Sequence, residues 1–176
     1  MIKRTIEGSL FREMLLTGAA CLEKNKQAID AMNVFPVPDG DTGTNMSMTM
    51  QRAVAEIRQV KSDSVEELAS ALSMGALRGA RGNSGVILSQ IFRGFSRALK
   101  GKKNELDARL LADALTMGTE AAYKAVMKPK EGTIAADERC GQQSGSKRRG
   151  CISDYRCHAA KRRSCAEKNS GYASRA

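Results

Sequence analysis

A glycine-rich loop with two aspartates carries the strongest chemical signal in this 176-residue sequence. The loop reads Asp39-Gly40-Asp41-Thr42-Gly43-Thr44-Asn45. Carboxylates two positions apart can converge on a hard cation such as Mg²⁺, which takes oxygen ligands and often shares its shell with substrate phosphates. The loop leads into a predicted helix, whose free N–H groups and dipole favour phosphate. The same residues also suit an ordinary Asp/Gly turn, so the pattern alone leaves both interpretations open.

A second polar glycine loop precedes another predicted helix. Its sequence, Arg81-Gly82-Asn83-Ser84-Gly85, could offer the Ser84 hydroxyl and backbone N–H groups to a phosphate. The alternative is a glycine that ends one helix and a serine that caps the next. Glu131-Gly132-Thr133 forms a third turn and has little signal alone. The sequence has no GxxxxGK[ST] P-loop and no strand–GxGxxG–helix unit, so the common nucleotide-binding folds lack support.

Helices are predicted on either side of these loops, because apolar residues in the flanking segments recur near a 3.6-residue period. The period covers five segments, residues 9–31, about 44–60, 64–77, 86–99 and about 106–127. Ser64 and Glu67 form a capping box that can satisfy two backbone N–H groups at the start of the third segment. We expect a polar glycine loop over 79–85 and no strand before residue 135. The sequence therefore predicts an all-α fold of antiparallel helices joined by short loops.

The composition agrees with a helical core and argues against a membrane protein. Hydrophobic residues make up 41% of the chain and aromatic residues only 4%, with nine Met and no Trp. Such a core is mostly aliphatic, which favours helices over strands. No apolar run approaches the roughly 18 residues that span a bilayer. The N-terminal residues carry charges and lack the apolar stretch of a secretory signal, so we expect a cytoplasmic protein without a membrane span.

The last segment, residues 135–176, differs in composition from the rest. It holds ten Lys and Arg against four Asp and Glu, four of the five Cys, and the only His. Its single large aliphatic residue is Ile152, so we expect a disordered basic tail. The cysteines lie eleven, six and eight positions apart, which lacks the close pairs of zinc sites. Basic clusters could contact nucleic-acid phosphates, but we expect no nucleic-acid partner without a framework to present them.

In this order, the three loops resemble the N-terminal kinase domain of bacterial fatty acid kinase, in the DhaL-like (Dak2) branch of the dihydroxyacetone kinase family. The similar stretches are Asn33–Met46, Gly79–Gln90 and Pro129–Ile134, and the resemblance covers about residues 1–134. It implies an up-and-down barrel of eight helices, with ATP and two Mg²⁺ ions held by loops at one rim. About five of those helices would fall within residues 1–134, so the barrel would be incomplete.

The resemblance also implies roles for individual residues. Asp39 and Asp41 would bind the magnesium ions, and Asn33 stands near the position of a third aspartate in the dihydroxyacetone kinases. The nucleotide and its phosphates would be surrounded by Thr42, Gly43, Thr44, Asn45, Met46, Ser84 and Gly85, and the nucleoside by Thr133 and Ile134. The implied chemistry is phosphoryl transfer, in which positioning and metal charge do most of the work and no further catalytic residue is expected.

The implied acceptor is a fatty acid carboxylate, presented by a separate lipid-binding protein and converted to an acyl phosphate. Dihydroxyacetone is the alternative acceptor, although the Pro-flanked form of the aspartate loop favours the fatty acid branch. A non-enzymatic helical fragment whose basic tail binds nucleic acid is the alternative from another class, and a homodimer is compatible with the sequence. After Ile134 the sequence departs abruptly from the family, and we interpret residues 135–176 as a frameshifted reading frame. We therefore expect weak activity, or none, from this chain.

Overall fold

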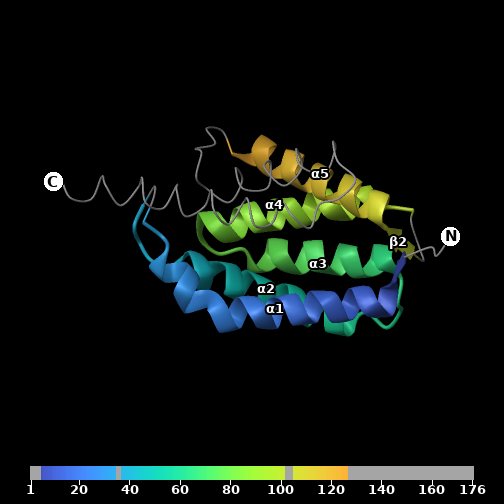
Figure 1. Cartoon of the computed structure of the whole chain (residues 1–176), viewed down its shortest axis with the longest axis horizontal. Coiled ribbons are helices and arrows are strands. Elements are labelled where there is room, and N and C mark those ends of the chain that lie inside the picture. Colours follow the sequence, from blue (N-terminus) through green and yellow to red (C-terminus); the bar gives the residue numbers. More distant parts are fainter. Residues whose placement is uncertain (1–4, 35–36, 102–104, 127–176) are drawn as a thin grey trace, which may run out of the picture. The chain divides into compact units, whose positions relative to one another are not determined.

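The computed structural model describes residues 5–34, 37–101 and 105–126, and within them the fold is all-α. Its five helices are α1 (Gly8–Ala31), α2 (Thr42–Gln59), α3 (Val65–Gly79), α4 (Gly82–Ala98) and α5 (Ala108–Ala125). Consecutive helices pack side by side and run in opposite directions (Figure 1). The predicted all-α, antiparallel arrangement is thus confirmed for these residues. Among them, no helix is both long and apolar enough to cross a membrane. The predicted tail, residues 135–176, lies outside the described residues.

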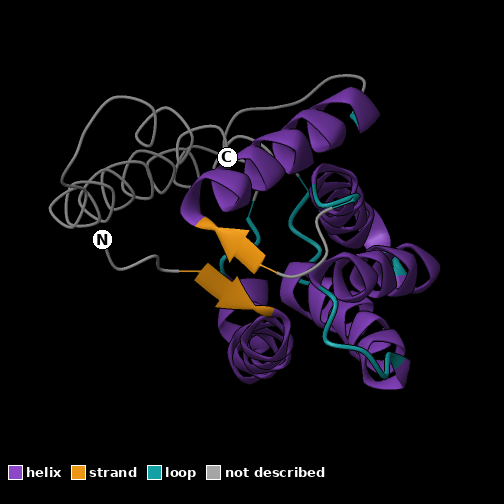
Figure 2. Ribbon diagram, turned by 90° about the vertical axis from the view of Figure 1, so that its right-hand side faces the viewer, coloured by secondary structure: helices purple, strands orange, loops and turns teal. Residues whose placement is uncertain are grey.

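Two short strands were not predicted by the sequence. Strand β1 (Thr5–Glu7) pairs antiparallel with β2 (Glu105–Asp107), and Ile6 lies opposite Leu106. Figure 2 shows the strands between the first turns of α1 and α5. Three residues are too few to show an alternating pattern, and the pairing joins segments about a hundred residues apart. The expectation of no strand before residue 135 was therefore wrong.

The predicted glycine loop over 79–85 is mostly helical. Helix α3 continues through Gly79 and α4 begins at Gly82, so only Ala80 and Arg81 connect them. A side chain at Gly79 would place its Cβ 2.4 Å from the Arg52 Cβ. Gly82 has a φ of 57°, which favours glycine at the sharp entry to α4. These glycines allow close approach and a tight turn, so their number does not indicate a longer loop.

The largest buried side chains gather at the end of the bundle that carries the sheet. They come from the end of α2, the first half of α3, the residue after α4, and β2, and are Ile57, Val65, Leu68, Leu72, Leu99 and Leu106. Phe11 of α1 and Phe95 of α4 stack there with ring centroids 6.0 Å apart. Burial of these apolar groups is the main stabilising term of the fold. Toward the opposite end, where α2 and α4 begin, the buried residues include glycines and hydroxyl side chains: Gly43, Ser47, Ser84 and Gly85.

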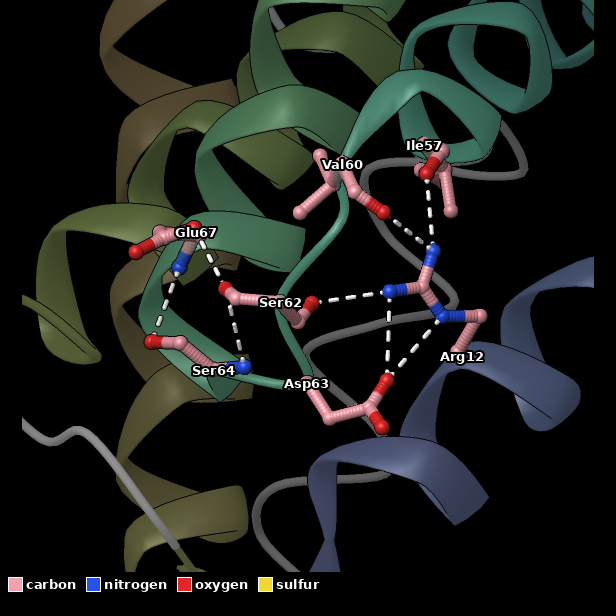
Figure 3. A network of polar contacts seen from close by, with 7 residues as sticks. All are labelled: Arg12, Ile57, Val60, Ser62, Asp63, Ser64 and Glu67. Atoms are coloured by element: carbon pink, nitrogen blue, oxygen red, sulfur yellow. Dashed lines mark hydrogen bonds and ion pairs between the residues drawn. The ribbon is translucent and has the colours of Figure 1, made fainter.

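At the sheet end, the Arg12 side chain joins α1 to the C-terminal end of α2 (Figure 3). Its guanidinium donates to the carbonyl oxygens of Ile57 and Val60 at 3.0 Å and of Ser62 at 2.8 Å. It also pairs with Asp63 Oδ1 at 3.1 Å. The last carbonyls of a helix have no partner within the helix, and a cation there also suits the helix dipole. Arg12 therefore satisfies the end of α2 from a neighbouring helix.

Replacing Arg12 with alanine should lower the free energy of unfolding by about 2–3 kcal/mol, because hydrogen bonds from a charged donor to partly buried carbonyls are lost. The ion pair is a small part of this, since the Asp63 side chain is 59% exposed. Asp63→Asn should therefore cost less than about 1 kcal/mol. Urea denaturation of the two variants measures the difference, and equal losses would contradict this division.

The capping box predicted for Ser64 and Glu67 is only half formed. Ser64 Oγ accepts from the Glu67 backbone N–H at 3.5 Å, as expected. The Glu67 carboxylate instead accepts from the Ser62 hydroxyl, whose oxygen lies 3.4 Å from the Ser64 backbone nitrogen (Figure 3). Ser62 thus takes the place that the Glu67 side chain was predicted to fill, because the preceding loop folds back over the start of α3.

Candidate functional site

The two glycine loops meet at the end of the bundle away from the sheet (Figure 1). The Arg81 backbone N–H donates to Thr49 Oγ1 at 3.2 Å, and Thr49 Oγ1 donates to the Asn45 carbonyl oxygen at 2.8 Å. A Cβ on Gly82 would lie 2.4 Å from Asn45 Nδ2, and one on Gly85 would lie 2.4 Å from Thr49 Oγ1. The structure therefore brings the first turns of α2 into contact with the α3–α4 connection and the start of α4.

Two helix N-termini consequently face the same region. Helix α2 begins at Thr42 and α4 at Gly82, and neither cap residue, Asp41 or Arg81, uses its side chain to cap its helix. Ser84 Oγ lies 3.5 Å from the Thr42 carbonyl oxygen, so the first turns of both helices touch. The first N–H groups of a helix have no acceptor within it, and the dipole makes this end positive. Such paired termini suit a phosphate chain.

The two aspartates lie on the loop beside these termini. Asp39 and Asp41 are both exposed, and Gly40 between them has a φ of 62°. Asn33 Nδ2 donates to Asp39 Oδ1 at 2.5 Å, which brings the third predicted metal residue to the same loop. Within the described residues, no three His, Cys, Asp or Glu side chains gather as a metal site. A bound Mg²⁺ would therefore depend on two carboxylates, water and phosphate oxygens, a set that this ion accepts.

Sequence reasoning missed Asp30, which holds the start of α2 against the end of α1. Its carboxylate accepts from the Thr44 backbone N–H at 3.0 Å and from the Thr44 hydroxyl at 2.7 Å. These hydrogen bonds, chiefly the one from the hydroxyl, lower the pKa of Asp30. Thr44, predicted to surround the phosphates, thus already has an acceptor for both donors. The partners are fourteen positions apart on different helices, and no local pattern links them.

The other predicted nucleotide-binding residues differ in how far they are buried. Gly43 and Gly85 are buried where helices touch, and a Cβ on Gly43 would lie 2.2 Å from the Lys26 carbonyl oxygen. The half-buried residues Thr42, Asn45 and Met46 lie in the first turns of α2. Thr133 and Ile134 lie outside the described residues, so their predicted role at the nucleoside stays a prediction.

Glu23 forms a second polar link between α1 and α2, below the loops. Its carboxylate pairs with Lys26 at 2.5 Å and accepts from the Ser47 hydroxyl and from Gln51 Nε2 at 3.1 Å. The contact with Lys26 contributes most to lowering the pKa of Glu23, and the Ser47 hydroxyl adds to it. Glu23 and Asp30 together therefore stabilise the α1–α2 contact in their charged forms.

The lowered pKa of Asp30 predicts how stability depends on pH. A carboxyl whose pKa is lower in the folded state contributes stability above its unfolded pKa, and loses it as pH falls through the folded value. Between about pH 6 and about pH 3, the free energy of unfolding of Asp30→Asn should therefore fall less than that of the unchanged chain. Urea denaturation across this range measures both slopes, with Asp113→Asn as the exposed control. Parallel slopes for all three proteins would contradict a stabilising Asp30 carboxylate.

Comparisons with known proteins match most of this chain. Residues 36–139 match the DAK2 domain. The chain is 57% identical to Protein YloV of Bacillus subtilis over 131 residues, which are 74% of this chain and 24% of that protein. It is 51% identical to an uncharacterized protein of Staphylococcus aureus strain USA300 over 129 residues, 73% of this chain and 23% of that protein. The chain thus spans about a quarter of the length of these curated relatives.

Proposed function

This chain belongs to the DAK2 domain family, and we propose that it forms the ATP- and Mg²⁺-binding part of a kinase. The DAK2 domain indicates the dihydroxyacetone kinase family and its DhaL-like subunit. One observation carries the proposal: the N-termini of α2 and α4 meet beside Asp39 and Asp41. Donors for phosphate and acceptors for a cation thereby adjoin, as a metal–nucleotide complex requires.

In this proposal, Asp39 and Asp41 would hold Mg²⁺, with Asn33 beside them as a neutral oxygen donor. The metal, when bound, supplies positive charge to the phosphate oxygens during transfer of the terminal phosphoryl group. The first N–H groups of α4, the Thr42 N–H at the start of α2 and the Ser84 hydroxyl hold the phosphate chain, since Asp30 already accepts from the Thr44 N–H. Asp30 and Thr44 keep the start of α2 in place, so that these donors do not need to reorganise on binding.

For the acceptor, we propose a fatty acid carboxylate presented by a lipid-binding partner in the cytoplasm, with an acyl phosphate as the product. The basis is the resemblance of the Pro-flanked aspartate loop to the fatty acid kinases. Dihydroxyacetone is the competing acceptor, supported by the family to which the domain belongs. Supplying both acceptors separately and following consumption of ATP distinguishes them.

Calorimetric titration of the full chain with ATP, with and without Mg²⁺, tests the proposed function. We expect heat of binding in Mg²⁺ and little in excess chelator, because phosphates and carboxylates repel one another without the cation. Circular dichroism before and after titration checks that the sample is helical. A folded, helical sample that does not bind Mg²⁺–ATP would contradict the proposal, and binding of equal strength without metal would contradict the role of the aspartates.

A further inference from the structure

The end of the bundle away from the sheet, called the loop end below, has more carboxylates than unpaired cations. Asp30, Asp39 and Asp41 are all located there. A triphosphate adds several negative charges, and one bound Mg²⁺ neutralises only two of them. Binding at such a place is favoured by a further positive group that the protein itself does not already neutralise. A cation without a carboxylate partner at this end of the bundle would supply such a group.

Four described cations lie in the connecting loops or among the last six residues of the helices that end there. Lys26 pairs with Glu23 at 2.5 Å, Arg78 with Glu56 at 3.2 Å, and Lys124 with Glu120 at 3.8 Å. The fourth is Arg81, which is exposed and whose guanidinium has no hydrogen bond or ion pair with any other residue that the structure describes. Among these four, only Arg81 has a charge left for a ligand.

The backbone of Arg81 is fixed, although its side chain is free. Its N–H donates to Thr49 Oγ1 at 3.2 Å, and its carbonyl oxygen accepts from the Gly85 N–H at 2.9 Å in the first turn of α4. Its φ of −126° and ψ of 136° are those of extended backbone. Arg81 is thus the residue immediately before α4, and its backbone is held against Thr49 of α2. A side chain with a fixed origin loses less entropy when it binds than one on a mobile loop.

We propose that Arg81 is a phosphate-binding residue of this site, with its guanidinium taking anionic oxygens of the nucleotide's phosphate chain. The inference rests on the proposed function and adds to it a residue that supplies charge. A guanidinium presents several donors in a plane and can bind two phosphate oxygens at once. Thr44 is neutral and both of its donors are held by Asp30, so it offers neither charge nor a free hydrogen bond to the phosphates.

Arg81→Ala should weaken Mg²⁺–ATP binding about tenfold to a hundredfold, the range expected when a charge-assisted hydrogen bond is lost. Arg81→Lys keeps the charge without the planar geometry and should recover part of the affinity. Arg78→Ala is the matched control: it removes the same charge three positions away, where the guanidinium is already paired. Calorimetric titration of the full chain and its variants at two salt concentrations measures these affinities. The salt dependence of affinity should be less steep in Arg81→Ala than in Arg78→Ala, which a purely structural role would not produce.

The outcomes separate the two proposals. If the unchanged chain does not bind Mg²⁺–ATP, the proposed function fails and this inference fails with it. If the unchanged chain binds and Arg81→Ala binds equally well, this inference alone is overturned. The same holds if Arg78→Ala loses as much affinity as Arg81→Ala, because the effect would then be general loss of charge at the loop end.

Discussion

Replacing Asp39 and Asp41 together with asparagine should abolish Mg²⁺-dependent ATP binding and leave the fold intact. Both side chains are exposed, and asparagine keeps their size while removing the charge that a hard cation requires. The hydrogen bond from Asn33 to Asp39 can survive, because an amide oxygen also accepts. We expect a loss of affinity greater than about a hundredfold, since both carboxylates proposed to bind the ion change at once. Calorimetry in Mg²⁺ measures the affinity, and thermal melting by circular dichroism checks the fold.

Asp113→Asn is the control for the double variant. Asp113 is exposed on α5, near the sheet end of the bundle, so its replacement removes a carboxylate far from the loops. Its binding should equal that of the unchanged chain. If the double variant retains Mg²⁺-dependent binding, the two aspartates are not the metal ligands and the site must lie elsewhere. If its melting temperature falls sharply, the aspartates act in folding, which would contradict their exposed positions.

Gly94→Ala should destabilise the fold by about 3 kcal/mol, because α4 and α5 touch there with almost no space between their backbones. A Cβ at Gly94 would lie 2.2 Å from the Met117 carbonyl oxygen and 2.7 Å from the Gly118 Cα. These are backbone atoms, so a new methyl group must push the helices apart. A Cβ at Gly118 would in turn lie 2.9 Å from the Ile91 carbonyl oxygen, so the close contact involves both helices.

Gly18→Ala is the control, because it measures the helix preference of alanine at a position without a close contact. Gly18 also lies within a helix, α1, but a Cβ there meets nothing within 4 Å. Alanine is a better helix former than glycine, so this variant should be stabilised by about 0.5–1 kcal/mol. Urea denaturation gives both changes on one scale. Stabilisation of Gly94→Ala to the same degree would mean that α4 and α5 pack less closely than the structure has them.

The sequence by itself determined the features that depend on neighbouring residues. Apolar spacing predicted all five helices within a few residues, because the 3.6-residue period needs only one chain segment to be visible. The loop from Asp39 to Asn45 was found because glycine, aspartate and a helix start stand together in the sequence. Asp107, which caps α5 by accepting from the Leu110 N–H at 2.7 Å, moved the start of that helix two residues beyond its predicted position.

Only the tertiary structure decided the contacts between distant segments. Asp30 holds Thr44, Arg12 closes the end of α2, and Thr49 fixes the backbone of Arg81. Each pair joins two different elements, and which helix ends meet depends on how the helices pack, not on any spacing along the chain. The short sheet was hidden from the sequence for the same reason. From the sequence, the glycines of the second segment predicted a polar loop. In the fold, their missing side chains let α3 and α4 approach α2, and that approach places the two helix N-termini side by side.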